Sequence, residues 1–382
     1  MTGINKPREI KSGGDRFSFG LASPQDSSQI LEILEEGHYG GNISLLYTRR
    51  NDAFASFMRE GEEVNIITCR DSLNDRIASI GACAQRTLYV NGIPRKVGYL
   101  FNLKTRSEYR KMFRFLPKGY EYCYQVHREK KLPFFLMTIL EGNRDAIKLF
   151  EKRRAFMPDH YPLGTYRVFA FKTGLKCKPM PGFHFRRCSE ADMPAVLQFL
   201  NETGKNYQFF PWLQPEDFRD KSKKGISPGD FYSLHDDRGE ITACGAIWDQ
   251  KTYKQYIVKG YRGFFKRIAP FSAVLPVFGY PHILAKPGTI LDFFTLSYWA
   301  VKDNHPGLFT HFLKNISQCP GAKDYRFFVL GIHDANTLKN SLERLPHFSY
   351  TSRIYLVDWD KSGNRLNQLD RDRVLYLECG TL

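Results

Sequence analysis

The segment at residues 17–36, FSFGLASPQDSSQILEILEE, recurs in a diverged form at residues 183–202, FHFRRCSEADMPAVLQFLNE. The two segments align without gaps and agree at both phenylalanines, one serine, one aspartate, two leucines and the final glutamate. In each, a short strand precedes apolar residues at helical spacing. The shared aspartates, Asp26 and Asp192, fall at the predicted helix start, where a carboxylate caps free N–H groups and complements the helix dipole. An internal repeat of this kind predicts two copies of one α/β unit.

A second pair of segments supports the duplication. Residues 134–152 and 327–344 each begin with a phenylalanine pair in a predicted strand and continue into a predicted helix. The spacing to the first pair is longer in the second copy, which indicates an insertion of about 27 residues there. A run at 173–182 that is bracketed by Gly and Pro marks the boundary between the two copies. We therefore expect an N-terminal domain at 1–175 and a C-terminal domain at 182–382.

Between the matched ends of the first copy, alternating apolar patterns predict three strands. Asn91-Gly92 between the last two is a strong hairpin signal. A basic helical stretch then leads to the strand that begins at Phe134. The three strands are 64–69, 77–90 and 96–105, and the helical stretch is roughly 106–131.

This order of elements, found once per half, resembles the GNAT superfamily of N-acetyltransferases. Residues 99–115, YLFNLKTRSEYRKMFRF, resemble the family's cofactor segment of pattern Q/R-x-x-G-x-G/A, with Arg110 as the opening basic residue. Residues 141–152 resemble the following segment, N-x-x-A-x-x-x-Y, with Asn143 and Ala146 in place. The resemblance implies an α/β (α+β) fold of two tandem acyl-CoA N-acyltransferase-like domains, each a mixed central sheet flanked by helices.

The resemblance also implies where an acyl-CoA binds. The strands at 96–105 and 134–140 would separate, with the pantetheine arm between them. Independently, residues 104–118 carry six basic side chains against the single acid Glu108, at a junction of strand and helix that suits a pyrophosphate; the alternative is a solvated basic helix. The expected cofactor-binding residues are Leu103, Thr105, Arg110, Lys111, Met112, Arg114 and Asn143.

The sequence departs from the family pattern at three positions. Phe113 and Phe115 stand where glycines would let the backbone approach a phosphate. Phe150 stands where the family often has a tyrosine that protonates the departing thiolate. Tyr161 or Tyr166 could supply that proton, although a structural role is the more common one for either. No catalytic residue is assigned.

The second copy departs further. Its equivalent cofactor strand, expected at 290–301, is followed by KDNHPGLFTHF without an Arg-rich loop, so we expect a degenerate domain that closes the substrate cleft. The stretch 248–267 alternates aromatic with basic residues, which suits either an anionic partner or a strand with a solvated basic face. Glu60, Glu62 and Glu63 directly precede the predicted strand at 64–69 and could place a carboxylate near the cleft as a general base. The alternative is a run of solvated charges. His305 and His311 lack the spacing of a metal pair.

Charge and composition limit the partners and the compartment. The net charge is +16, of which residues 1–181 contribute +11, and this favours an anionic partner such as a phosphorylated cofactor or nucleic acid. No apolar stretch reaches the roughly 18 residues of a membrane-spanning helix, and the N-terminus lacks the apolar core of a signal peptide. Eight cysteines without a CxxC pair argue against a disulfide framework and a zinc site. We expect a cytoplasmic protein without a metal or membrane insertion.

The function implied by the resemblance is transfer of an acyl group from acetyl-CoA or another acyl-CoA to the amine of a small molecule or peptide. Two alternatives stay open. The first is a tandem transferase that resembles the tRNA-dependent peptidoglycan aminoacyltransferases, which the positive charge would suit. The second is a catalytically inactive GNAT-like binding module, which the three phenylalanines would suit. Nucleic acid is a possible but not a favoured partner, and the sequence does not predict the oligomeric state.

Overall fold

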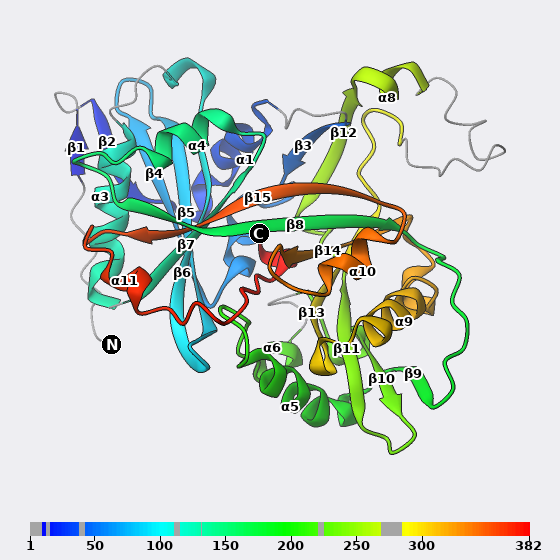
Figure 1. Ribbon diagram of the computed structural model, residues 1–382. Coiled ribbons are helices and arrows are strands. Elements are labelled where there is room, and N and C mark those ends of the chain that lie inside the picture. Colours follow the sequence, from blue (N-terminus) through cyan, green and yellow to red (C-terminus); the bar gives the residue numbers. More distant parts are fainter. Residues whose placement is uncertain are drawn as a thin grey trace.

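The computed structural model describes residues 10–12, 16–37, 43–110, 115–130, 132–220, 225–268 and 285–382. Among these residues, thirteen strands form one mixed sheet in the order β1-β2-β4-β5-β6-β7-β15-β8-β14-β13-β11-β10-β9 (Figure 1). Two more strands, β3 and β12, pair separately. The strands of the first half are β1 Ile10–Ser12, β2 Phe17–Leu21, β3 Ile43–Thr48, β4 Glu63–Asp71, β5 Arg76–Val90, β6 Ile93–Thr105, β7 Phe134–Leu140 and β8 Asp159–Lys172. Those of the second half are β9 Phe183–Arg187, β10 Phe231–Asp236, β11 Ile241–Trp248, β12 Gln255–Tyr261, β13 Phe293–Val301, β14 Phe327–His333 and β15 His347–Asp358.

Helices cover both faces of the sheet. In the first half they are α1 Ser27–Glu35, α2 Ala53–Phe57, α3 Phe115–His127 and α4 Arg144–Glu151; in the second they are α5 Met193–Gly204, α6 Glu216–Arg219, α8 Gly263–Ile268, α9 Pro306–Ile316, α10 Lys339–Glu343 and α11 Asn364–Asn367. Neighbouring residues of β5 pack into different cores, Ala78 with α3 and α4 and Ile77 with α1 and α2. Because successive side chains of a strand point to opposite faces, these helix pairs lie on opposite sides of the sheet.

The repeat seen in the sequence is a repeat in the structure. β2 with α1 and β9 with α5 are the two copies of the first motif, and β7 with α4 and β14 with α10 are the two copies of the second. Asp26 and Asp192 lie at the start of α1 and α5, as expected. Their carboxylates accept hydrogen bonds from the N–H groups of Ser23 and Ser189, at 2.8 Å each, and not from the helix N–H groups.

The sheet runs without a break from one half into the other. β8 of the first half lies between β14 and β15 of the second, and β15 also pairs with β7. Figure 1 shows β8 and β15 as two long strands that cross the whole molecule. Strands from both halves thus alternate at the middle of the sheet.

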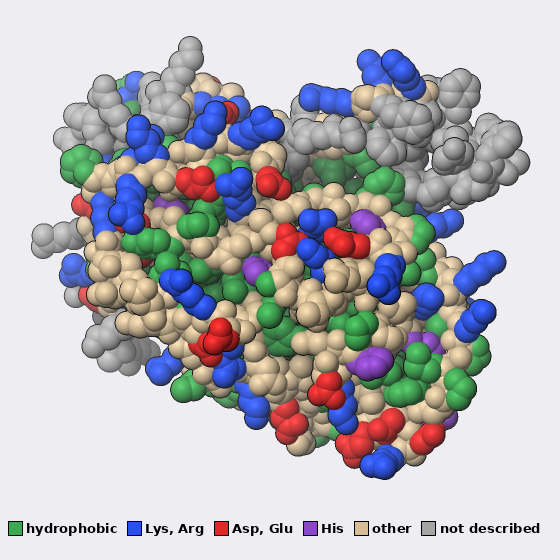
Figure 2. All heavy atoms as spheres, viewed as in Figure 1, with side chains coloured by type: hydrophobic (Ala, Val, Ile, Leu, Met, Phe, Trp, Pro, Cys, Tyr) green, Lys and Arg blue, Asp and Glu red, His purple; other side chains and the backbone are tan. Residues whose placement is uncertain are grey.

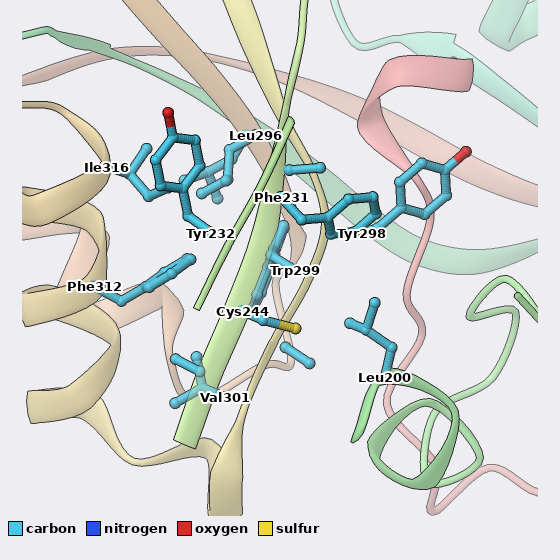
Figure 3. Packing of buried hydrophobic residues seen from close by; sticks show 14 of the residues in the cluster. Leu200, Phe231, Tyr232, Cys244, Leu296, Tyr298, Trp299, Val301, Phe312 and Ile316 are labelled. Atoms are coloured by element: carbon cyan, nitrogen blue, oxygen red, sulfur yellow. The ribbon is translucent and has the colours of Figure 1, made fainter. Parts of the chain in front are cut away.

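The largest core lies mainly in the second half and is joined by Tyr89, Phe169 and Phe171 of the first. Leu200 of α5 lies on one side of the sheet and Phe312 and Ile316 of α9 lie on the other, with Tyr298 and Trp299 of β13 among the buried strand residues between them (Figure 3). The mixed fold predicted from the sequence, a central sheet flanked by helices, is confirmed.

The insertion in the second copy contains β12. This strand pairs with β3 of the first half, and its Ile257 and Val258 are buried. Lys259 and Arg262 are exposed. The basic aromatic stretch at 248–267 therefore includes a packed strand with cations on its outer side.

Candidate functional site

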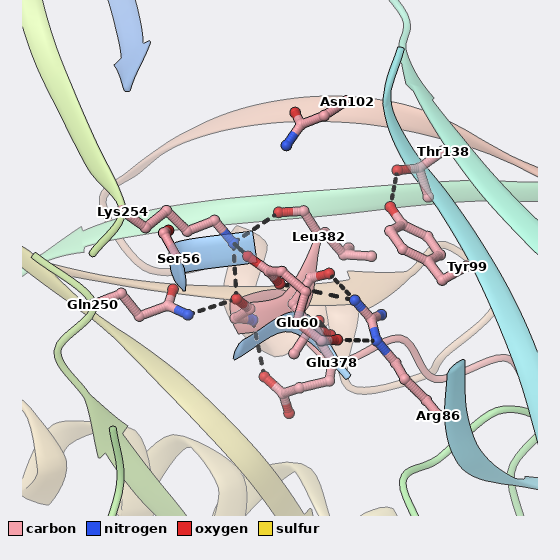
Figure 4. A network of polar contacts seen from close by, with 12 residues as sticks. Ser56, Glu60, Arg86, Tyr99, Asn102, Thr138, Gln250, Lys254, Glu378 and Leu382 are labelled. Atoms are coloured by element: carbon pink, nitrogen blue, oxygen red, sulfur yellow. Dashed lines mark hydrogen bonds and ion pairs between the residues drawn. The ribbon is translucent and has the colours of Figure 1, made fainter. Parts of the chain in front are cut away.

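β6 and β7 separate within the first half. Their parallel pairing runs from Val97 opposite Phe134 to Leu100 opposite Met137, and beyond it no further β6–β7 pair occurs in the described residues. At the point of separation the Tyr99 hydroxyl and Thr138 Oγ1 lie 2.7 Å apart, on β6 and β7 respectively (Figure 4). The strands thus separate at the place that the sequence resemblance implied.

The free end of β6 carries a β-bulge. Ala82 of β5 lies opposite Phe101 and Ile80 lies opposite Lys104, so two residues, Asn102 and Leu103, face one on β5. Asn102 has a φ of 51°, a left-handed conformation that asparagine tolerates better than most residues. The Leu103 side chain is 47% exposed. Two of the expected site residues, Leu103 and Thr105, therefore lie on the separated end of β6.

The second half repeats this bulge. β13 and β14 pair only from Phe293 to Thr295, and the register shift between Cys244 and Ala246 of β11 places a bulge at Tyr298 and Trp299. Tyr298 has a φ of 48°. The equivalents of Asn102 and Leu103 are therefore Tyr298 and Trp299.

In each half a gap lies between two strands that separate, β6 and β7 in the first half and β13 and β14 in the second. The two gaps differ in the groups that bond to the bulge N–H atoms. In the second half, the Tyr298 N–H donates to Glu378 Oε2 at 2.7 Å and the Trp299 N–H donates to the Tyr376 hydroxyl at 3.3 Å. In the first half, no side chain of the described residues bonds to the N–H of Asn102 or Leu103. The second gap is thus occupied by the chain itself.

The basic residues after β6 do not act as one group. Arg106 is only 2% exposed and donates to the carboxylates of Glu32 on α1 and Glu36 just after it, at 2.8 and 3.0 Å, so its charge is used within the fold. Lys104 donates to the Leu34 carbonyl oxygen, and burial together with the nearby Arg110 lowers its pKa to about 8 against the opposing effect of Glu36.

Of the three described cations at 104–110, Arg110 is the exposed one. It follows the short turn of 3₁₀ helix Ser107–Tyr109 and forms no ion pair with any residue in the described ranges. Lys111, Met112 and Arg114 lie outside the described residues, as do Phe113 and the side chain of Phe115. Of the residues expected to bind the pyrophosphate at 110–114, the structure therefore describes Arg110.

Asn143 lies at the carboxyl end of β7, where its side chain accepts from the Ala146 N–H at 3.3 Å and caps α4. Phe150 on α4 is buried against Tyr120 and His160. Tyr166 is buried and donates to the Leu377 carbonyl oxygen at 2.7 Å, which is a structural contact. The hydroxyl of Tyr161, the other candidate, donates to Asp159 at 3.3 Å.

A buried ionic cluster lies between the halves (Figure 4). Glu60 forms ion pairs with Arg49, with Lys254 at 3.3 Å and with Arg86 at 3.9 Å. Burial alone would raise the pKa of Glu60, but Lys254, Arg49 and Arg86 together lower it to about 2. Glu60 is therefore neither a solvated charge nor a usable general base at neutral pH.

The partners of Glu60 were not predicted from the sequence. Arg49 directly follows β3, Arg86 lies on β5 and Lys254 directly precedes β12, so no local spacing links them. The one available signal was the position of Lys254 in the basic aromatic stretch.

A small cavity adjoins this cluster. Its volume is about 70 Å³, and its lining includes Glu60, Arg86, Tyr99, Tyr298 and Glu378. Pockets for small ligands measure roughly 300 Å³ or more. The cavity is thus too small for a CoA ester, and the separated end of β6 is the better candidate for that role.

Within the ranges that the structure covers, no group of three or more His, Cys, Asp or Glu side chains could hold a metal ion. No described helix is both long enough and apolar enough to cross a membrane. On the face in Figure 2, basic and acidic side chains are interspersed over the body of the protein.

No family model matches the sequence and no curated protein matches it. Solved structures do. A crystal structure of Saccharomyces cerevisiae N-myristoyltransferase with bound myristoyl-CoA superposes with a TM-score of 0.61 at 12% identity, over 98% of this chain and 92% of that one. A GCN5-related N-acetyltransferase from Sphaerobacter thermophilus superposes with a TM-score of 0.54 at 11% identity, over 90% of this chain and 96% of that one. Both alignments cover 90% or more of this chain and so include both halves. This chain therefore has the same fold as these two structures, which is the fold that the sequence resemblance implied.

Proposed function

We propose that the protein is an N-acyltransferase that moves an acyl group from acetyl-CoA or another acyl-CoA to an amine. In this proposal the N-terminal domain, residues 1–175, binds the acyl-CoA, and the C-terminal domain, residues 182–382, closes the cleft around a small-molecule or peptide acceptor. The structural neighbours support it because one is an N-acetyltransferase and the other holds myristoyl-CoA.

The observation that carries the proposal is the bulge at Asn102 and Leu103, whose N–H groups bond to no side chain of the described residues. In the second half, the equivalent backbone N–H of Tyr298 binds a carboxylate oxygen at 2.7 Å. The same backbone geometry in the first half suits a thioester carbonyl oxygen, which becomes negatively charged as an amine attacks it. Fixed N–H donors that face such an oxygen stabilise the transition state.

The remaining expected residues follow from this placement. The backbone at Leu103 and Thr105 would hold the pantetheine arm beside the separated strand. Arg110, with Lys111, Met112 and Arg114 after it, would face the pyrophosphate, and the α4 start at Asn143 lies at the end of the neighbouring strand. Cations and helix N-termini are the groups that bind phosphates in proteins.

The reaction requires a neutral amine whose nitrogen attacks the thioester carbonyl carbon. The carbonyl oxygen takes up negative charge, the carbon–sulfur bond breaks, and the thiolate of CoA gains a proton while the nitrogen loses one. Glu60 does not serve as the base because three cations hold its pKa at about 2. We assign no general acid or base.

The test is a calorimetric titration with CoA, acetyl-CoA and myristoyl-CoA. Saturable binding of one CoA per chain, with the acyl ester bound more tightly than CoA, supports the proposal. Binding of tRNA without CoA would support the aminoacyltransferase alternative. Binding of neither would support the inactive module and contradict the proposal.

A further inference from the structure

We infer that Tyr376 and Glu378 are a built-in ligand of the second half's strand gap. The second half keeps a backbone site for an acyl or carboxylate oxygen, and the chain fills that site with its own carboxylate. What the first gap binds rests on the proposed function; the occupation of the second gap does not.

The two gaps correspond residue by residue. In each half one strand, β6 or β13, pairs with its parallel neighbour only near one end of the pairing and then carries a two-residue bulge that starts at a positive φ. The bulges are Asn102 with Leu103 and Tyr298 with Trp299. An oxygen bound at one bulge therefore marks the place where an oxygen would bind at the other.

Both carboxylate oxygens of Glu378 are used. Oε2 accepts from the Tyr298 N–H at 2.7 Å and from the Tyr376 hydroxyl at 3.2 Å, and Oε1 accepts from the Gly380 N–H at 3.0 Å. The residue is 5% exposed. Since a buried carboxylate is stable only when its oxygens are bonded, the bulge N–H is part of what keeps Glu378 in place.

The segment around Glu378 is fitted to its position. A Cβ added at Gly380 would clash with the ring of Trp248 and lie 3.1 Å from Ser297 Oγ on β13. The Gly380 carbonyl oxygen accepts from Gln250 and from Lys254, at 2.7 and 3.0 Å. These contacts leave no room for a pantetheine arm in the second gap.

The Thr381 carbonyl oxygen accepts from Arg86 of β5 at 2.6 Å. Arg86 also donates from Nε to the Glu60 carbonyl oxygen at 2.8 Å. The segment that fills the second gap is therefore tied to the first half, beside the separated strands. Its position depends on both halves.

The test is hydrogen exchange of individual backbone amides, followed by NMR in the whole chain. In the free protein we expect slow exchange at Tyr298 and Trp299 and fast exchange at Asn102 and Leu103. Glu378→Ala should speed exchange at Tyr298 about tenfold or more, since one bonded acceptor is lost. Glu343→Ala, which removes a half-exposed carboxylate of the same half, should leave Tyr298 unchanged.

If Glu378→Ala fails to fold, Tyr376→Phe is the second test, because it removes the acceptor of the Trp299 N–H and one of the three hydrogen bonds to Glu378 but leaves the bond from the Tyr298 N–H in place. Exchange at Trp299 should then become faster while the rest of β13 keeps its protection. Unchanged exchange at Tyr298 in a folded Glu378→Ala chain, or at Trp299 in Tyr376→Phe, would overturn the inference.

Addition of myristoyl-CoA or acetyl-CoA separates this inference from the proposed function. Slower exchange at Asn102 and Leu103, with Tyr298 and Trp299 unaffected, supports both. If the ester protects neither bulge, the proposed acyl-CoA site fails, and the inference still stands on the Glu378→Ala result. If the ester changes exchange at Tyr298 and Trp299, the second gap admits a ligand and the inference is wrong.

Discussion

We expect the folded protein to lose stability in mild acid because His160 is buried. It lies on β8, 8% exposed, with its ring centroid 4.9 Å from that of Phe150, 5.9 Å from Tyr120 and 6.5 Å from Tyr355. Burial among these rings lowers the pKa of His160 from 6.5 to about 4, although the Pro158 carbonyl and Asp159 offset part of the effect. The imidazole is therefore neutral in the folded protein at pH 7.

The size of the effect follows from the two pKa values. In the unfolded chain His160 takes up a proton near pH 6.5, and in the folded chain only near pH 4. Between these values the unfolded state binds more protons, so stability falls as the pH falls. The full difference is about 3 kcal/mol, and about 2 kcal/mol of it is lost at pH 5 relative to pH 8.

The assay is urea unfolding of the wild-type chain and of His160→Phe at pH 8, 7, 6 and 5. Phenylalanine fits an aromatic cluster and does not titrate, so the wild type should lose about 2 kcal/mol more than the variant between pH 8 and pH 5. Carboxylates titrate in both chains and cancel in the comparison. His184→Gln, a change at an exposed histidine, should run parallel to the wild type, and parallel curves for His160→Phe would refute the reasoning.

Arg110→Ala should weaken CoA binding roughly 10- to 150-fold in a calorimetric titration, the equivalent of about 1.5 to 3 kcal/mol for charge-assisted hydrogen bonds. Glu60→Gln leaves the buried Lys254 without its carboxylate, so the free energy of unfolding should fall by about 3 to 5 kcal/mol in urea. Cys177 and Cys379 are the two cysteines that are not buried. Burial raises the pKa of Cys379 to about 12 and also raises that of Cys177, where Lys314 opposes it. Cys177 Sγ lies 3.6 Å from His311 Nδ1, which can accept its proton. Cys177 should therefore be alkylated first by iodoacetamide, and more slowly in His311→Ala, as measured by peptide mass spectrometry.

Each of these outcomes has a matched control. Lys323→Ala removes an exposed cation of the second half and should leave CoA affinity unchanged. Equal losses of CoA affinity in Lys323→Ala and Arg110→Ala would show that only the net charge matters and would contradict a specific role for Arg110. Glu62→Gln, at an exposed acid in the same run as Glu60, should cost well under 1 kcal/mol. Faster labelling of any other cysteine than Cys177 would contradict the third expectation.

The parts of the fold that the sequence predicts are those with a local pattern. The hairpin at Asn91-Gly92 is one: both residues have positive φ, 53° and 79°, as the turn that joins β5 to β6 requires. The repeated strand and helix pairs are another, because their apolar spacing lies within single segments. The predicted strands at 64–69, 77–90 and 96–105 are confirmed as β4, β5 and β6 for the same reason.

The parts that the sequence does not predict depend on pairs far apart along the chain. β15 pairs with β7 and β8, and Lys254 pairs with Glu60, across about two hundred residues in which no local spacing links the partners. Arg106 is the instructive case, since its charge suggested a place in an anion cradle. Burial against Glu32 and Glu36 decides its role, and burial cannot be read from the residue type.

The paired bulges explain why one gap is open and the other filled. Asparagine tolerates a left-handed backbone better than most residues, so the bulge at Asn102 needs less enforcement from its surroundings. Tyr298 has a bulky side chain at a φ of 48°, and such a residue keeps this conformation only when its surroundings enforce it. The hydrogen bond from its N–H to Glu378 is such an enforcement. The same bulge geometry occurs in both halves, and the residue types at its first position differ in how much enforcement they need from their surroundings.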